Sequence, residues 1–266
     1  MRNYYKHLSA SRKMKRGQVA IFVIVAIVLV GFVLALFFLP QARVLLPGGE
    51  SQDPGSFMRS CLKSKLEEGL GKLAEQGGSL NPSPSTSYQG KEIQYLCYTD
   101  ENYLPCIVQK PLLVKSFQQE LENYVRSDVK RCVSDLKSDY ESRGYTVSSS
   151  SGDFNVSIIP GRISLELEEG ITISKETTQT FKSFSATQSS ELYNLLLIAT
   201  SIVDFESKLG DSETTLYIQY YPELKIEKMR RDADKIYTLT NVNSGESFTF
   251  ATRSLVWPAG FGGELS

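Results

Sequence analysis

Three pairs of neighbouring carboxylates are the residues of this chain whose types and spacing could support acid–base chemistry. They are Glu67 with Glu68, Glu168 with Glu169, and Asp232 with Asp234. Two carboxylates can act as general acid and base on a glycosidic bond, and carboxylate oxygens also bind calcium. Each pair lies beside a predicted turn or on a predicted helix face, where solvated carboxylates are common. We therefore expect no catalytic residue and no metal site, with a carboxylate-dependent, glycan-active enzyme as an alternative.

Nucleophilic catalysis is disfavoured by the distribution of histidine. His7 is the only histidine, and it lies in the N-terminal arm. Because Ser–His–Asp and Cys–His arrangements need an imidazole base, they are excluded for the rest of the chain. The chain also has no P-loop, G-x-G-x-x-G, H-E-x-x-H or G-x-S-x-G motif. The sequence thus predicts a protein that is not an enzyme and has no cofactor.

Four cysteines, Cys61, Cys97, Cys106 and Cys132, lie in the C-terminal four-fifths of the chain. An even number in an outward-facing domain predicts two disulfides. Three pairings are possible, and we favour Cys97–Cys106, which flank a predicted hairpin turn, with Cys61–Cys132 joining two helices. A zinc site is the alternative, but it needs pairs of cysteines two to four residues apart, and this chain has none.

The elements that position these residues begin with an apolar stretch at residues 19–39, which carries no charge. As a helix it would be roughly 31 Å long, close to the thickness of a bilayer core. We expect a transmembrane helix over residues 18–39, preceded by a basic arm (residues 1–17) and followed by a linker (residues 40–56). A cleaved secretory signal would be shorter and end in small residues.

Charge predicts the orientation of this helix. Six basic residues and no acidic one precede it, and only Arg43 follows it closely. The positive-inside rule then places the N-terminus in the cytoplasm and the C-terminal domain outside the cell membrane. The remaining 22 basic residues face 30 acidic ones, a net charge of about −8 for the distal part. Nucleic acid is therefore not an expected partner, whereas the lipid bilayer is.

The sequence KRGQVAIF at residues 15–22 is the most specific motif. A basic pair, a glycine, a glutamine and an apolar helix resemble the class III signal of archaeal pilin-like precursors. The resemblance implies cleavage between Gly17 and Gln18 and packing of the freed helix into a filament. Phe22 stands where many pilins carry a glutamate. The alternative is a plain anchor whose basic flank follows the charge rule.

Hydrophobic periodicity predicts an α+β domain with an antiparallel sheet. We expect a disulfide-stapled helical part with a hairpin at residues 57–144, a β-α-β part at 145–252 and a tail at 253–266. Within them, residues 79–87 are expected to be an irregular loop and residues 214–252 to be strands. Helices are expected at residues 57–76, 111–140 and 189–209.

Two surface features favour binding. The distal part is rich in tyrosine, a residue type enriched at interfaces. Asn155-Val156-Ser157 is a glycosylation acceptor sequence. The chain combines the apolar N-terminal start, Cys61-Leu62 in a helix that ends at Gln76-Gly77-Gly78, a tyrosine-rich hairpin and a helix that carries Cys132. This combination resembles a group of uncharacterised single-pass surface proteins of archaea. We expect a membrane-anchored protein that functions in binding or envelope assembly, with other surface proteins or copies of itself as partners.

Overall fold

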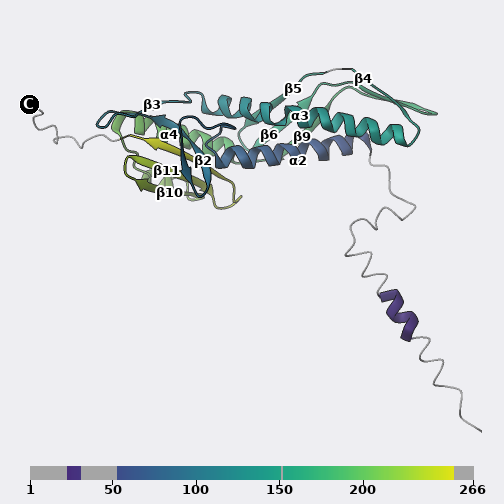
Figure 1. Cartoon of the computed structure of the whole chain (residues 1–266), viewed down its shortest axis with the longest axis horizontal. Coiled ribbons are helices and arrows are strands. Elements are labelled where there is room, and N and C mark those ends of the chain that lie inside the picture. Colours follow the sequence, from purple (N-terminus) through teal and green to yellow (C-terminus); the bar gives the residue numbers. More distant parts are fainter. Residues whose placement is uncertain (1–22, 31–52, 151, 255–266) are drawn as a thin grey trace, which may run out of the picture. The chain divides into compact units, whose positions relative to one another are not determined.

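A computed structural model describes residues 23–30, 53–150 and 152–254 (Figure 1). The chain divides into two compact units, Met1–Gln52 and Asp53–Ser266. In the first unit, residues 23–30 are helical, and their large apolar side chains are exposed. The remainder of the span predicted for residues 18–39 lies outside the described residues. Within the described ranges, no helix combines the length and the hydropathy that a membrane crossing requires.

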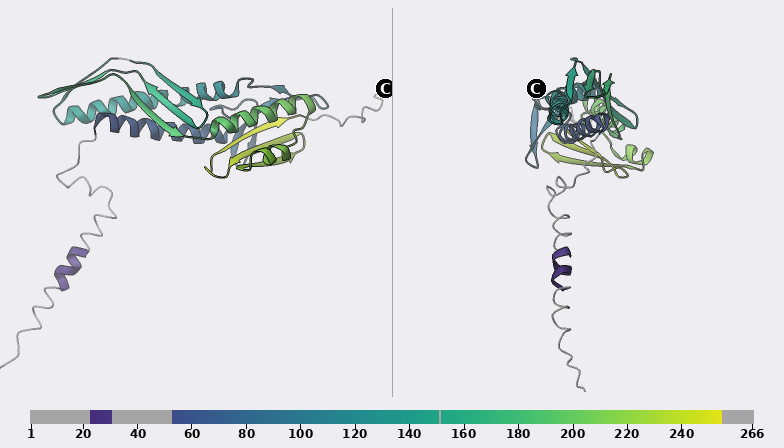
Figure 2. Two further views of the ribbon diagram at one scale, coloured as in Figure 1. Left: turned by 180° about the vertical axis from the view of Figure 1, so that it is seen from behind. Right: turned by 90° about the vertical axis from the view of Figure 1, so that its right-hand side faces the viewer.

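Two long helices, α2 (Pro54–Glu75) and α3 (Leu113–Ser142), run side by side in the second unit (Figures 1 and 2). Asp53 caps the first of them, since its side chain accepts a hydrogen bond from the Ser56 backbone N–H at 3.2 Å. Apolar residues recur at three- to four-residue spacing on both helices, and these stripes are buried against each other. The buried residues of the stripes include Leu62, Leu66, Leu73, Phe117, Leu121 and Val125.

Both disulfides predicted from the cysteine count are present. Cys61 on α2 is bonded to Cys132 on α3, with the Cα atoms 6.0 Å apart. Cys97 is bonded to Cys106, with the Cα atoms 5.3 Å apart. The described residues contain no free cysteine, so no thiolate is left for the alternative zinc site.

The main sheet joins segments from both ends of the unit. Its strands are β1 (Ser85–Tyr88), β2 (Lys91–Tyr98), β3 (Ile107–Val108), β10 (Leu224–Arg231), β11 (Asp234–Asn241) and β12 (Ser247–Arg253). They lie in the order β1-β2-β12-β11-β10, with β3 paired to β2. All pairs are antiparallel except β2 with β12, which is parallel.

One face of this sheet is packed against helices. Tyr237 and Phe250 stack with ring centroids 5.2 Å apart, and Phe248 continues the aromatic layer. Helix α4 (Leu192–Leu209) contributes a stripe of apolar residues to the same core. Alternate residues of β11 and β12 point to the opposite face, as period-two geometry requires. Among them are Ile236, Thr238 and Thr249.

Two three-stranded sheets pack against α2 and α3 (Figure 2). The first contains β4 (Thr146–Ser149), β7 (Ile171–Ser174) and β8 (Thr178–Phe181), in that order. The second contains β5 (Phe154–Ile159), β6 (Arg162–Leu167) and β9 (Phe184–Ser189), in that order. All their pairs are antiparallel, and the predicted α+β class is confirmed.

Several local predictions are wrong. Residues 214–220 were expected to be a strand, but Thr215–Tyr220 is a helix, α5. Six residues are too few for alternation to exclude a helix. Residues 79–87 were expected to be a loop, yet β1 begins at Ser85 and pairs with β2. Strands β8 and β9 were also missed, because they are rich in serine and threonine rather than in large apolar residues.

Candidate functional site

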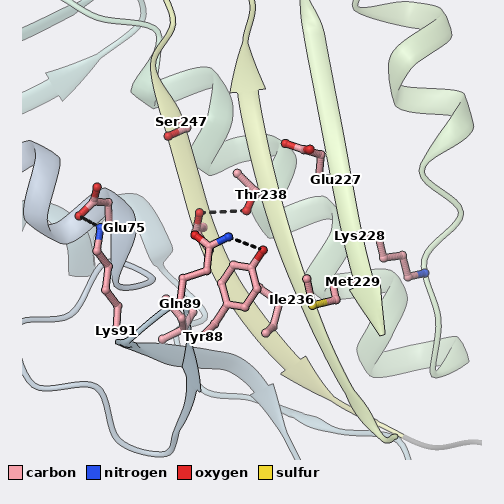
Figure 3. A pocket seen from close by; sticks show the side chains of 12 residues that line it. Glu75, Tyr88, Gln89, Lys91, Glu227, Lys228, Met229, Ile236, Thr238 and Ser247 are labelled. Atoms are coloured by element: carbon pink, nitrogen blue, oxygen red, sulfur yellow. Dashed lines mark hydrogen bonds and ion pairs between the residues drawn. The ribbon is translucent and has the colours of Figure 1, made fainter. Parts of the chain in front are cut away.

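A hollow of about 630 Å³ lies on the face of the main sheet that the helices leave open (Figure 3). Its floor is formed by outward-pointing residues of β10, β11 and β12, and its wall by the β1–β2 hairpin and the end of α2. The lining residues are Glu75, Tyr88, Gln89, Lys91, Ile93, Glu227, Lys228, Met229, Ile236, Thr238, Ser247 and Thr249. A concave, mixed apolar and polar site of this size suits a ligand or a short segment of a partner.

The hollow exists because β2 and β12 pair over only part of their length. Their parallel register begins at Tyr95 opposite Ala251, and it is irregular between Ala251 and Thr252. Before that point, the two strands have no pairing with each other, and the β1–β2 hairpin lies against the sheet face instead. Ile93 and Tyr95 are buried there with Ile236, which closes one end of the hollow.

The rim of the hollow is polar. Lys91 and Glu75 form an ion pair with the Nζ and Oε2 atoms 2.6 Å apart. The Thr238 and Thr249 hydroxyls are 3.1 Å apart on the floor. Gln89 donates a hydrogen bond to the Tyr88 hydroxyl at 3.1 Å (Figure 3). A floor of apolar and hydroxyl groups with an ion pair at its edge can hold an extended polar molecule that has one apolar side.

Acid–base chemistry in the hollow would require its two carboxylates. Glu75 is paired with Lys91, and Glu227 is paired with Lys225 at 3.0 Å. Each carboxylate therefore has a lysine as its nearest ionic partner.

A buried charged cluster lies beneath the opposite face of the sheet. Glu206 on α4 is fully buried, and Lys235 on β11 donates to it at 2.6 Å. The Tyr237 hydroxyl donates to the other carboxylate oxygen, and Lys235 also donates to the Gly210 carbonyl. Burial and the Glu206 charge raise the pKa of the Tyr237 hydroxyl far above its usual value. Because every member has partners, we assign this cluster to the packing of α4 on the sheet.

Asp211 extends this cluster to the surface. Lys228 and Arg230 both form ion pairs with its carboxylate, and Lys235 lies 3.5 Å away. Partial burial acts to raise the pKa of Asp211, but the hydrogen bond from Lys228 and the three positive charges outweigh it and lower that pKa. Asp211 is therefore ionised at neutral pH and positions the turn that follows α4.

The carboxylate pairs singled out from the sequence lie apart from the hollow. Glu68 accepts hydrogen bonds from Lys65 and Tyr124, each at 2.9 Å, on the surface of α2 and α3. Asp234 lies near Arg231 and Arg253 on the sheet, at 3.9 and 3.6 Å. None of the three pairs lines the hollow, and no group of three possible metal ligands occurs in the described part of the chain.

Sequence reasoning did not find the residues that line the hollow. Ile236 and Thr238 were recognisable only as alternate members of a strand, with no indication of which face would stay open. Asn155 is exposed on β5, so its side chain is accessible. Gly17 and Gln18 lie outside the described residues. No protein family model, no curated protein and no solved structure matches this chain.

Proposed function

We propose that this chain is a single-pass membrane protein whose extracytoplasmic domain binds a partner or takes part in envelope assembly, without catalytic chemistry. The pair of disulfides is the main support for an extracytoplasmic location of the domain, because such bonds persist in oxidising surroundings. The uncharged stretch at residues 19–39 and the basic arm before it support an N-terminus in the cytoplasm. The hollow on the main sheet is the proposed binding site.

Orientation can be tested with single added cysteines in whole cells of the source organism. Lys182→Cys places a thiol on an exposed loop, and Ser9→Cys places one in the basic arm. A maleimide that does not cross membranes should label the first variant in intact cells, and the second only after lysis. Labelling of the second variant alone in intact cells would reverse the proposed orientation. Labelling of neither before lysis would place the domain inside the cell.

Binding in the hollow can be tested by site-specific photo-crosslinking in native membranes. Met229 lines the hollow and is 45% exposed, so a photoreactive residue there should react with whatever occupies the site. The control position, Ile159, is 36% exposed at the end of β5 and does not line the hollow. We expect an adduct from position 229 that is absent at position 159. Thr249→Trp, which would fill the floor, should abolish this adduct. Equal adducts at both positions would refute the site.

A pilin-like filament subunit is the second candidate, supported by the KRGQVAIF motif at residues 15–22. Processing would leave Gln18 as the mature N-terminus. Mass spectrometry of the protein isolated from its native membrane distinguishes the two candidates. A peptide that begins at Gln18 would favour the filament subunit, and an intact start at Met1 or Arg2 would remove it.

A glycan-active enzyme is the weaker alternative, and it would have to use the two carboxylates of the hollow. The Glu75–Lys91 and Glu227–Lys225 ion pairs argue against it, because each carboxylate is paired with a lysine and not with the other carboxylate. Detectable hydrolysis of a glycan that is lost in Glu75→Gln or Glu227→Gln would restore this alternative.

A further inference from the structure

A second concave surface of about 670 Å³ lies between the end of α4 and helix α5. Its walls are apolar and aromatic: Phe205, Leu209, Leu216, Tyr217, Tyr220 and Tyr221. We name this surface the α4–α5 groove. No residue of α5 is buried, although four of its six residues are large apolar or aromatic ones: two tyrosines, a leucine and an isoleucine. Tyr217 holds the helix in place through a 2.7 Å hydrogen bond with Ser201.

The exposed apolar side chains of the unit are concentrated at this groove. Of the fourteen large hydrophobic residues exposed between Asp53 and Ser254, five line this groove: Phe205, Leu209, Leu216, Tyr220 and Tyr221. Tyr220 is 79% exposed, Leu209 65% and Leu216 56%. Contiguous apolar surface of this kind is uncommon on a soluble domain and indicates that something covers it.

The sequence supplies a matching segment directly after the last described residue. The described residues end at Ser254, and the sequence continues with Leu255, Val256, Trp257, Pro258 and, after Ala-Gly, Phe261. Trp257 is the only tryptophan of the protein. No charged residue occurs before Glu264. This segment is thus apolar, and its proline favours an extended backbone over a helix.

The point where the segment leaves the sheet lies close to the groove. Thr252 pairs with Lys235, and the Lys235 side chain reaches the carbonyl of Gly210. Gly210 lies between Leu209 and Asp211, which both line the groove. Seven extended residues span up to roughly 24 Å, whereas the whole of α5 is only about 9 Å long. The segment can therefore reach the groove and cross it.

We propose that residues 255–261 of the same chain dock in the α4–α5 groove, with the Trp257 ring among its aromatic walls. A short tether gives the segment a high effective concentration at the groove, so docking needs little intrinsic affinity. The Asp211 and Glu213 carboxylates at the rim disfavour an anionic lipid surface as the occupant, and they do not oppose an uncharged segment. This inference does not depend on the proposed binding function of the hollow.

Tryptophan fluorescence of the full chain in lipid nanodiscs tests the proposal directly, because Trp257 is the only source of this signal. We expect a blue-shifted emission that is protected from a soluble quencher. Leu216→Ser and Tyr220→Ser remove exposed apolar walls of the groove and should cause loss of most of that protection and a red shift. Ile159→Ser removes an apolar side chain that is 36% exposed on β5, outside the groove, and should leave both unchanged.

Removal of residues 255–266 provides a second measurement. The shortened chain should bind more of an apolar fluorescent dye, and adding Leu216→Ser to it should remove that gain. The proposal is refuted if Trp257 is fully quenched in the unmodified chain, or if the groove variants leave its protection intact. Protection that disappears on dilution would instead indicate docking into a second copy, and protection that changes only with lipid composition would indicate the membrane. Both results would overturn docking within one chain.

Discussion

At the residue scale, the buried pair of Glu206 and Lys235 is where a single substitution should reduce the free energy of unfolding most. Lys235→Met would leave the Glu206 carboxylate buried with only the Tyr237 hydroxyl as a donor. We expect a loss of about 3–5 kcal/mol in the free energy of unfolding, as for other buried pairs that lose one partner. Glu206→Leu combined with Lys235→Met should cost less than the two single changes together, because no charge is left unpaired. Urea unfolding of the four proteins measures this cycle.

An exposed ion pair on the same helix is the matched control. Lys208 and Asp204 lie 2.7 Å apart with both side chains more than half exposed, so Lys208→Met should change stability by less than about 1 kcal/mol. A Lys235→Met effect no larger than that of Lys208→Met would contradict the assignment. The sequence held a partial signal, since Glu206 falls on the buried stripe of α4. Its partner, 29 residues later, could not be inferred without the sheet register.

Asp211 gives a pH-dependent prediction with a definite sign. Its pKa is lowered in the folded state, so its ionised form stabilises the fold above the unfolded pKa. That contribution is lost as pH falls through the lower, folded pKa. Asp211→Asn should therefore reduce the melting temperature slightly at pH 7, and the difference should vanish once the pH falls below the lowered pKa of the folded state. The effect should be small, because the side chain is nearly half exposed. A difference in melting temperature that grew as the pH fell would contradict this prediction.

At the scale of elements, alanine substitutions at two glycines of α2 should have opposite effects on stability. An added Cβ at Gly69 would lie 2.7 Å from the Tyr124 ring and 2.8 Å from Leu121, whereas one at Gly71 would meet nothing within 4 Å. Gly71→Ala should stabilise the protein by up to about 1 kcal/mol, through helix propensity alone. Gly69→Ala should destabilise it despite the same propensity gain, because α2 and α3 would be pushed apart. Thermal unfolding of both variants checks the contrast.

The two disulfides should contribute unequally. In the chain-entropy model, the longer loop closed by Cys61–Cys132, with a sequence separation of 71, contributes roughly 4 kcal/mol. The loop closed by Cys97–Cys106, with a separation of 9, contributes roughly 3 kcal/mol. Replacing the first pair by alanines should therefore lower the urea midpoint more than replacing the second. The reverse order would indicate that local packing around β2 and β3, rather than chain entropy, determines the difference.

Sequence periodicity predicted the long elements with many apolar residues correctly and missed the short or polar ones. The helices α2, α3 and α4 each carry a long stripe, and each was found close to its expected bounds. Helix α5 was mistaken for a strand, because Leu216, Ile218 and Tyr220 alternate and no buried face was present to reveal a helical period. Strands β8 and β9 carry mainly hydroxyl side chains, so their pairing depends on the register of neighbours.

For the whole molecule, the sequence could predict the class but not the connections. The parallel pairing of β2 with β12 joins residues that are more than 150 positions apart, and hydrophobic alternation does not specify such a partner. The hollow follows from this pairing and from the point where it stops. The α4–α5 groove likewise depends on the tertiary position of a helix that the sequence did not predict. Neither the hollow nor the α4–α5 groove could therefore be predicted without the topology.

The same topology predicts how the unit unfolds. One core cluster includes Leu165 of a three-stranded sheet, Leu66 of α2 and Phe250 of the main sheet. The ring centroids of Phe117 on α3 and Phe248 on the main sheet are 6.2 Å apart. Since α2 and α3 contribute to the packing of both regions, residues 57–144 and 145–252 should unfold in one transition. Leu165→Ala and Phe250→Ala should each cost about 2–5 kcal/mol. In each variant, probes in the three-stranded sheets and probes in the main sheet should report the same shifted transition. Hydrogen exchange that opened residues 145–190 alone in Leu165→Ala would show instead that the three-stranded sheets form a separate cooperative unit.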